Sequence, residues 1–314
     1  MTSIASAPAK VILFGEHFVV HDVKAILCSI DKRVKVTTTP IDEKKILIKS
    51  NMGQAQLDLN SKQEIKSSFR PFAFIAKNMI EKHNHEGGLE ITIDSDIPSG
   101  VGLGSSSACC VAAVGSVSGL FEKLPKEEIL KIAIQAEQTV FKNASGADNT
   151  VCTYGGIIEY DKKNGFNKLN IEPDFHLIIA NSMQTHSTSK IVSKVGEFKE
   201  KNSDTFLSLC KKESHLINNV KDALTSNDLV SLGKYMSENQ AYLEEIGVSN
   251  DKLRSMIDIA NKTSYGSKLT GAGGGGCIIS ITDEQNLEET IKNLQDNNYD
   301  CFSTKIDSKG LDTF

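Results

Sequence analysis

Residues 98–108 combine glycines and serines at a spacing that favours the binding of a phosphate group. The segment reads Pro-Ser-Gly-Val-Gly-Leu-Gly-Ser-Ser-Ser-Ala, with glycines at positions 100, 102 and 104. Glycine lets the main chain adopt positive φ angles and approach a ligand closely, because no Cβ stands in the way. The serines open the apolar run 108–120, which predicts a buried helix. Unpaired N–H groups at a helix N-terminus attract phosphate, so we expect a phosphorylated ligand here.

The spacing in this segment matches neither of the two common nucleotide-binding fingerprints. A P-loop carries Lys followed by Ser or Thr after its last glycine, whereas Ser105 follows Gly104 here. The dinucleotide fingerprint is G-x-G-x-x-G, and this segment has G-x-G-x-G. A glycine-rich turn with ordinary serine caps is therefore the alternative interpretation. The strand-like alternation at 89–94 gives the order strand, glycine loop, helix, which favours a phosphate site.

Three ionisable side chains gather where a predicted N-terminal strand runs into a turn. Lys10 opens the apolar run 10–14, and Glu16 and His17 follow directly after Gly15. A surface lysine and a polar turn are the ordinary alternative for such residues. Their position beside a glycine favours a functional role.

Two carboxylates later in the chain are further candidates for chemistry. In the helix predicted over 125–142, Glu137 falls inside the apolar arc. A carboxylate in such a place has to be paired, bound to a metal or neutralised. A structural ion pair or helix cap and a metal ligand facing the glycine loop are both open for Glu137. Asp148 lies in a predicted short turn before Gly155 and Gly156.

The elements that must position these residues follow from periodicity and turn signals. Strands are predicted at 10–14, 25–39, 45–48, 89–94, 157–160, 175–181, 278–281 and 299–306. Helices are predicted at 72–82, 108–120, 125–142, after the hydroxyl-rich turn 184–190, and near 204–225, 228–246, 249–262 and 284–297. Residues 51–68 lack clear periodicity, and the polar segment 161–173 is the candidate domain boundary. A second glycine loop at 268–277 predicts that two domains line one cleft.

Composition excludes several classes of partner. The net charge is −5, which argues against nucleic acid or an anionic membrane held by a broad basic surface. The N-terminus does not resemble a secretory signal, and no apolar run approaches the length of a membrane span. Seven cysteines without a C-x-x-C pair predict reduced thiols in a cytoplasmic protein, and a structural zinc site is not expected.

Four segments together resemble the superfamily of galactokinase, homoserine kinase, mevalonate kinase and phosphomevalonate kinase, the GHMP kinases. They are residues 8–21, 98–108, 145–148 and 268–277, in that order. The resemblance spans most of the chain and is greatest to the mevalonate kinase branch. It implies an α+β fold with an N-terminal domain like the second domain of ribosomal protein S5 and a C-terminal ferredoxin-like domain. We expect these domains to be residues 1–165 and 174–314, with the site between them.

The resemblance also implies a reaction and a set of roles. The γ-phosphoryl group of ATP would pass to the 5-hydroxyl of mevalonate, a step of isoprenoid biosynthesis. Asp148 would be the catalytic base, with Lys10 beside it. Mevalonate would be contacted by Lys10, Glu16, His17 and Asp148. Mg²⁺ would be bound by Ser106 and Glu137. The residues expected to hold ATP are Ser95, Pro98, Ser99, Gly100, Val101, Gly102, Leu103, Gly104, Ser105, Ser106 and Ser107.

Elementary chemistry agrees with these residue types. Phosphoryl transfer depends mainly on positioning and on neutralisation of charge. It needs a backbone cradle, a hard cation held by oxygen ligands, and a carboxylate within reach of the hydroxyl. A lysine beside that carboxylate can stabilise the developing alkoxide.

The chain departs from the family pattern at Ala9, Asp22 and Asn143-Ala144, where glycine or proline is usual. These changes affect loop conformation and leave the ionisable groups in place. Phosphomevalonate kinase is the alternative enzyme, and a non-catalytic nucleotide-binding relative is the alternative from another class. Retention of Lys10, Ser106, Glu137 and Asp148 favours an active kinase, with ATP and mevalonate as partners and a homodimer left open.

Overall fold

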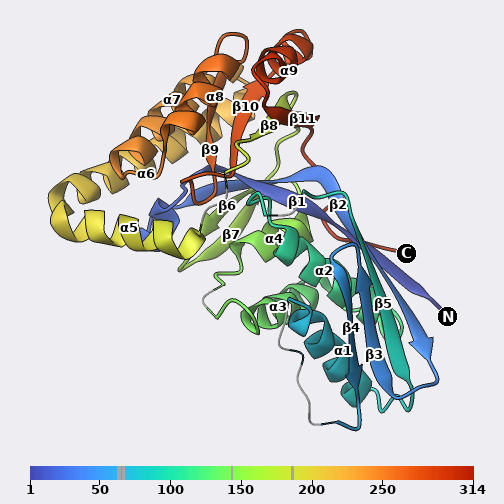
Figure 1. The fold of residues 1–314 in the computed structure, drawn as a ribbon. Coiled ribbons are helices and arrows are strands. Elements are labelled where there is room, and N and C mark those ends of the chain that lie inside the picture. Colours follow the sequence, from blue (N-terminus) through green and yellow to red (C-terminus); the bar gives the residue numbers. More distant parts are fainter. Residues whose placement is uncertain (62–64, 66–67, 99, 143, 185–186) are drawn as a thin grey trace.

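The chain folds around two β-sheets in a computed structural model that describes residues 1–61, 65, 68–98, 100–142, 144–184 and 187–314 (Figure 1). The first sheet has the strand order β12-β1-β2-β5-β3-β4, and β6 and β7 extend it from β2. Its strands are β1 (Ser3–Phe14), β2 (Ala25–Ile41), β3 (Lys45–Ser50), β4 (Gly53–Asp58), β5 (Gly88–Ser95), β6 (Ile157–Asp161), β7 (Gly165–Leu169) and β12 (Asp312–Thr313). The long strand β2 pairs with β5 along one half and with β6 along the other.

Helices α1 (Arg70–Lys82), α2 (Ser105–Ser118) and α4 (Ala147–Tyr154) pack on the first sheet, and α3 (Lys126–Gln138) packs against these three helices. Helix α2 lies at the centre and contacts β1, β2 and all three of the other helices. It is built from Ala, Ser, Cys, Val and Gly, and eleven of its residues are buried. Small side chains let the sheet and the helices approach α2 from every side, so this helix fixes the position of the loop before it.

The second sheet is antiparallel, with the strand order β11-β8-β10-β9. Its strands are β8 (His176–Asn181), β9 (Gly266–Thr270), β10 (Cys277–Thr282) and β11 (Asp300–Thr304). Helices α5 (Thr188–Lys201), α6 (Ser203–Ser226), α7 (Leu229–Glu245), α8 (Asp251–Ala260) and α9 (Leu287–Asp296) accompany it. The α+β class predicted from the sequence is confirmed.

The two sheets are joined through β1 and through the end of the chain. Thr270 of β9 bonds Ile12 of β1 twice: its hydroxyl accepts from the Ile12 amide at 3.2 Å and donates to the Ile12 carbonyl at 3.0 Å. After β11 the chain returns to the first sheet, where β12 pairs with β1. Strand β7 also belongs to the first sheet, through β6. The division into residues 1–165 and 174–314 stays a prediction.

Sequence patterns missed the elements that carry little apolar periodicity. Strands β4 and β7 occupy segments predicted to be irregular or linker, and nearly all of their side chains lie outside the core. An edge strand of that kind has no buried face, so its side chains do not alternate between apolar and polar. Strand β9 was read as part of the glycine loop, although all five of its residues are buried.

Two predictions about helices near Asp148 were wrong. Asp148 was placed in a short turn, whereas it lies in the first turn of helix α4, whose sequence ADNTVCTY contains few strong helix formers. Tertiary packing stabilises this short helix, because six of its eight residues are buried. Helix α3 ends at Gln138 and not at 142, and Val140 and Phe141 then follow as exposed residues.

Candidate active site

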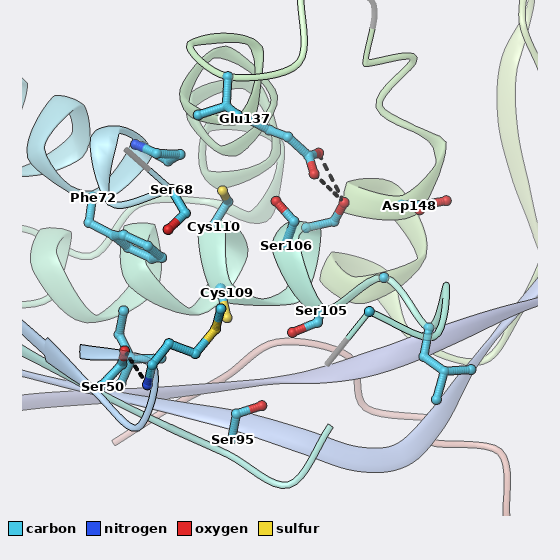
Figure 2. Close-up of a pocket in the computed structure, with 18 of the residues that line it drawn as sticks. Ser50, Ser68, Phe72, Ser95, Ser105, Ser106, Cys109, Cys110, Glu137 and Asp148 are labelled. Atoms are coloured by element: carbon cyan, nitrogen blue, oxygen red, sulfur yellow. Dashed lines mark hydrogen bonds between the residues drawn. The ribbon is translucent and has the colours of Figure 1, made fainter. Parts of the chain in front are cut away.

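A cavity of about 500 Å³ lies between the glycine loop, helices α1 and α3, and the strands β3 and β5 (Figure 2). One end is polar and carries Ser105, Ser106, Glu137 and Asp148, which Figure 2 labels, together with Ser107. The other end is lined by the aromatic and apolar side chains of Met52, Phe69, Phe72, Val140 and Phe141. A polar end with helix amides and an apolar end fit a ligand with phosphates at one end and a flat apolar ring at the other.

The glycine loop has the geometry that its sequence predicts. Gly100, Gly102 and Gly104 all have positive φ, between 72° and 84°. Gly104 is the N-cap of α2, so the unpaired N–H groups of that helix begin at Ser105. Among the residues predicted to hold ATP, the cavity is lined by Ser95, Pro98, Gly100, Gly102, Leu103, Gly104, Ser105, Ser106 and Ser107.

Two of the residues predicted to bind ATP are not in this set. Val101 does not line the cavity, and its side chain is buried in the core. Ser99 lies outside the described residues. Contacts of these residues with ATP stay predictions.

Lys10 and Asp148 form an ion pair at the polar end of the cavity, with Lys10 Nζ 3.1 Å from Asp148 Oδ2. Strand β1 carries Lys10, and its backbone N–H donates to the Leu103 carbonyl at 2.9 Å, which ties the strand to the glycine loop. The Lys10 side chain is 5% exposed, whereas that of Asp148 is 37% exposed. The carboxylate is therefore accessible to a ligand while the ammonium is held beside it by the fold.

Glu137 is buried, as its place in the apolar arc predicts, and it faces the start of helix α2. It is 7% exposed, and the Ser107 hydroxyl is 2.9 Å from each of its carboxylate oxygens. Figure 2 shows this contact beside Ser106. Burial raises the pKa of Glu137, and the nearby negative charge of Asp148 acts in the same direction. Helix α3 thus holds a carboxylate against the loop with no cationic side chain bonded to it among the described residues.

The donors around Glu137 suit Mg²⁺ better than a transition metal. They are a carboxylate and serine hydroxyls, which are hard oxygen ligands. Among the described residues there is no group of three or more His, Cys, Asp or Glu that could hold a metal by itself. Mg²⁺ at kinase sites is commonly bound by one or two carboxylates together with waters and substrate phosphates. The residues present therefore fit an ion that arrives with a nucleotide.

Replacing Glu137 by Gln tests this assignment. We expect the Mg²⁺ concentration for half-maximal activity to rise by at least about 10-fold. At pH 8 the melting temperature of the variant should be equal to or above that of the wild type. A buried carboxyl with a raised pKa makes the protein less stable as the pH rises through that pKa, whereas Gln does not titrate. Both quantities come from a Mg²⁺ titration and a melting curve.

Glu128, an exposed glutamate on the same helix, provides the matched control. Glu128→Gln should leave the Mg²⁺ dependence unchanged. A Glu137→Gln protein that melts at lower temperature with unaltered Mg²⁺ dependence would identify Glu137 as a structural residue.

Glu16, in the turn after β1, is 1% exposed and forms an ion pair with Lys268 of β9, which is fully buried. Lys268 Nζ also donates to the Leu269 carbonyl at 2.6 Å. Burial raises the pKa of Glu16, and Lys268 opposes that shift. The predicted contact of Glu16 with an acceptor substrate stays a prediction.

His17 is held by the second glycine loop. Its Nε2 lies 2.9 Å from the Ala272 carbonyl. A carbonyl only accepts hydrogen bonds, so Nε2 carries the proton. Burial lowers the pKa of His17, so the ring is neutral near pH 7 and its Nδ1 is a hydrogen-bond acceptor. A neutral acceptor nitrogen suits contact with a hydroxyl group, and the prediction that His17 contacts the substrate stays open.

Sequence reasoning assigned no role to Lys268, Thr270 or Glu213. The first two lie inside residues 268–277, a segment singled out for its glycines and for its family resemblance. Glu213 lies on the buried stripe of α6 formed by Phe206, Leu209, Leu216, Ile217 and Val220, and it is fully buried. The signal that identified Glu137, a charge inside an apolar arc, was also available for Glu213.

Comparison with known proteins gives the family. Models of the GHMP kinases N terminal domain and the GHMP kinases C terminal match residues 71–156 and 220–300. The chain is 32% identical to a mevalonate kinase of Methanocaldococcus jannaschii over 96% of this chain and 99% of that protein. It is 34% identical to a mevalonate kinase of Pyrococcus furiosus, over 92% and 91%. The chain belongs to the GHMP kinase family.

A solved structure supports the same conclusion for the architecture of this GHMP kinase. The crystal structure of the Methanococcus jannaschii mevalonate kinase matches it with a TM-score of 0.86 at 30% identity, covering 96% of this chain and 98% of that one. The predicted two-domain GHMP kinase architecture is confirmed. None of the helices in the described part of the chain is both long and apolar enough to cross a membrane.

Proposed function

We propose that this GHMP kinase is a mevalonate kinase, which transfers the γ-phosphoryl group of ATP to the 5-hydroxyl of mevalonate to give 5-phosphomevalonate and ADP. The Lys10–Asp148 ion pair at the polar end of the cavity carries the proposal. At this end a carboxylate and a cation lie together, and an acceptor hydroxyl beside them would meet a phosphate bound by the glycine loop. The mevalonate kinases that align with nearly the whole chain support the choice of acceptor.

The chemistry divides between the two ends of the site. The amides of the glycine loop and the N-terminus of α2 bind the phosphates, and the apolar end of the cavity accepts the adenine ring. Asp148 accepts the proton of the acceptor hydroxyl as the oxygen bonds to the γ-phosphorus and the bond to the β-phosphate oxygen breaks. Lys10 stabilises the charge that develops on the attacking oxygen.

Mg²⁺ would be held by Glu137 and Ser106, together with the nucleotide. When bound, it neutralises phosphate charge. Ser107 keeps Glu137 oriented toward the loop through the hydrogen bonds described above.

Product identification tests the proposed function. With ATP, Mg²⁺ and mevalonate, we expect a single phosphorylated product whose phosphorus couples to the protons of C5 in a two-dimensional ¹H–³¹P NMR spectrum. Phosphorylation of the tertiary hydroxyl, or release of inorganic phosphate alone, would contradict the proposal.

A further inference from the structure

Four polar side chains form a buried cluster behind the acceptor side of the site, and the mechanism above leaves most of them without a role. They are Glu16 in the turn after β1, Glu213 of α6, Asn239 of α7 and Lys268 of β9. Their exposed fractions are 1% for Glu16 and 0% for the other three. Polar groups are retained at such depth only when partners offset the loss of hydration, so the partners of this cluster define what it does.

The cluster has more hydrogen-bond acceptors than donors. Glu16 is paired with Lys268, and Asn239 Nδ2 donates to Glu213 Oε2 at 2.7 Å. Glu16 Oε2, Glu213 Oε1 and Asn239 Oδ1 have no hydrogen-bond partner among the described residues. One proton on a carboxyl group would add the missing donor. It would also balance the charge, because two carboxylates face one ammonium.

Helix α6 holds the turn that carries Glu16 and His17. The ring of Phe206, on α6, lies 5.9 Å from that of Phe18 and makes an edge contact with His21 at 4.8 Å between ring centroids. About two helical turns further along α6, Glu213 lies near the backbone amide of Gly15, which favours the ionised form of its carboxyl. Helix α6, about 190 residues later in the chain, therefore lies against both ends of the segment 15–21.

We propose that Glu213 is a positioning residue for the acceptor substrate: through Gly15 and Glu16 it fixes the turn that presents Glu16 and His17, and it does so best when it carries a proton. This inference rests on the proposed function, because it assigns that turn to the mevalonate side of the site. Glu213 itself is fully buried and acts through its neighbours.

The expected consequence is a pH dependence of mevalonate binding. Burial, reinforced by the charge of Glu16, raises the pKa of Glu213 to about 7, while Asn239, Lys268 and Gly15 oppose the shift. Below that value Glu213 is protonated and uncharged, so the charges of Glu16 and Lys268 balance each other. Above it a second buried negative charge repels both Glu16 and an anionic acceptor such as mevalonate. The KM for mevalonate should therefore rise as the pH passes through about 7.

Other titratable and charged groups also face this region and could contribute to a pH dependence. Glu213 acts electrostatically on Cys210 of its own helix and on Tyr242 of α7, and burial already raises the pKa of both. Lys10 acts on Glu16 from β1, and Lys268 acts on His17. Lys199 of α5 lies over the Phe206 ring and beside His21. The pKa of His21 is lowered, chiefly by burial, so a pH profile alone does not identify the group, and a variant is needed.

The test compares the pH profiles of Glu213→Gln and the wild type, because Gln imitates the protonated carboxyl. From pH 6 to pH 8.5 we expect the KM of the wild type for mevalonate to rise by about fivefold or more. The KM of Glu213→Gln should stay flat near the low-pH value. The KM for ATP should be the same in both proteins. As the pH rises from 4.5 to 7, the free energy of unfolding of the wild type should fall relative to that of the variant. In this range the folded wild type still holds a proton on Glu213 that its unfolded state has released.

Asp222→Asn is the matched control, since it removes an exposed carboxylate from the same helix, and it should keep the wild-type profile. Asn239→Ala removes a donor that favours ionised Glu213, so its KM rise should move to higher pH. Unaltered profiles in both Glu213→Gln and Asn239→Ala, with only the melting temperature changed, would overturn the inference while wild-type turnover of mevalonate stands. Absence of that turnover at every pH would overturn the proposed function and this inference together.

Discussion

Asp148→Asn is expected to lower kcat by at least about 100-fold while ATP binding and folding are retained. A primary alcohol does not ionise by itself near neutral pH, so a base must take its proton as the bond to phosphorus forms. General-base assistance is worth about 10² to 10⁴ in rate, and a loose transition state needs less of it than a tight one. Asn has nearly the same size as Asp but cannot accept the proton. The measurement is kcat at saturating ATP and mevalonate.

The position of Asp148 makes this variant informative about chemistry. Its side chain is 37% exposed, so the loss of its contact with Lys10 should disturb the core little. We expect a cooperative melting transition and an unchanged Kd for ATP. Asp174→Asn, which alters an exposed aspartate before β8, should keep wild-type kcat. A near-normal kcat in Asp148→Asn would remove Asp148 as the base.

Gly104→Val is expected to have a second large effect, because Gly104 lies in the glycine loop and against the side chain of Lys10. Its φ of +72° is unfavourable for any residue with a Cβ and most of all for a β-branched one. A Cβ there would lie 2.6 Å from Lys10 Cγ and 3.0 Å from Lys10 Cε. The side chain of Lys10 would have to move away from Asp148. We expect a higher KM for ATP and a kcat lowered by about 100-fold.

Gly102→Val separates these two effects. Gly102 has a similar φ of +84°, but a Cβ at that position meets no atom within 4 Å. It should raise the KM for ATP through the strained loop and reduce kcat much less than Gly104→Val does. Steady-state kinetics with each substrate varied in turn give the comparison. Equal kcat values for the two variants would contradict the effect assigned to Lys10, and an ATP affinity unchanged in both would show that the loop is only a turn.

The sequence predicted those parts of the site whose conformation or burial is caused by residues of the same short segment. Alternating glycines before a small-residue helix predicted a loop of positive φ angles, and Gly100, Gly102 and Gly104 adopt them. The place of Glu137 inside an apolar arc predicted a buried carboxylate that needs a partner, and the structure buries it with Ser107 as its hydrogen-bond donor. In both cases the local pattern already contains the cause.

The parts that sequence did not predict depend on pairings between distant segments. Nothing near Lys268 in the sequence indicates that it is fully buried against Glu16, because the partner is about 250 residues away. Strand β9 was hidden next to a run of glycines, and helix α4 was hidden in residues with low helix propensity. Edge strands β4 and β7 lack a buried face, so their sequences carry no alternation to detect.

ADP release by the wild-type protein with a panel of acceptors tests directly whether mevalonate is the substrate. With ATP and Mg²⁺, we expect kcat/KM for mevalonate to exceed that for 5-phosphomevalonate, galactose and homoserine. The reason is that a neutral His17 and a buried carboxylate at Glu16 face an uncharged hydroxyl better than a second phosphate. Faster turnover of 5-phosphomevalonate, or ADP release that no acceptor stimulates, would contradict that expectation.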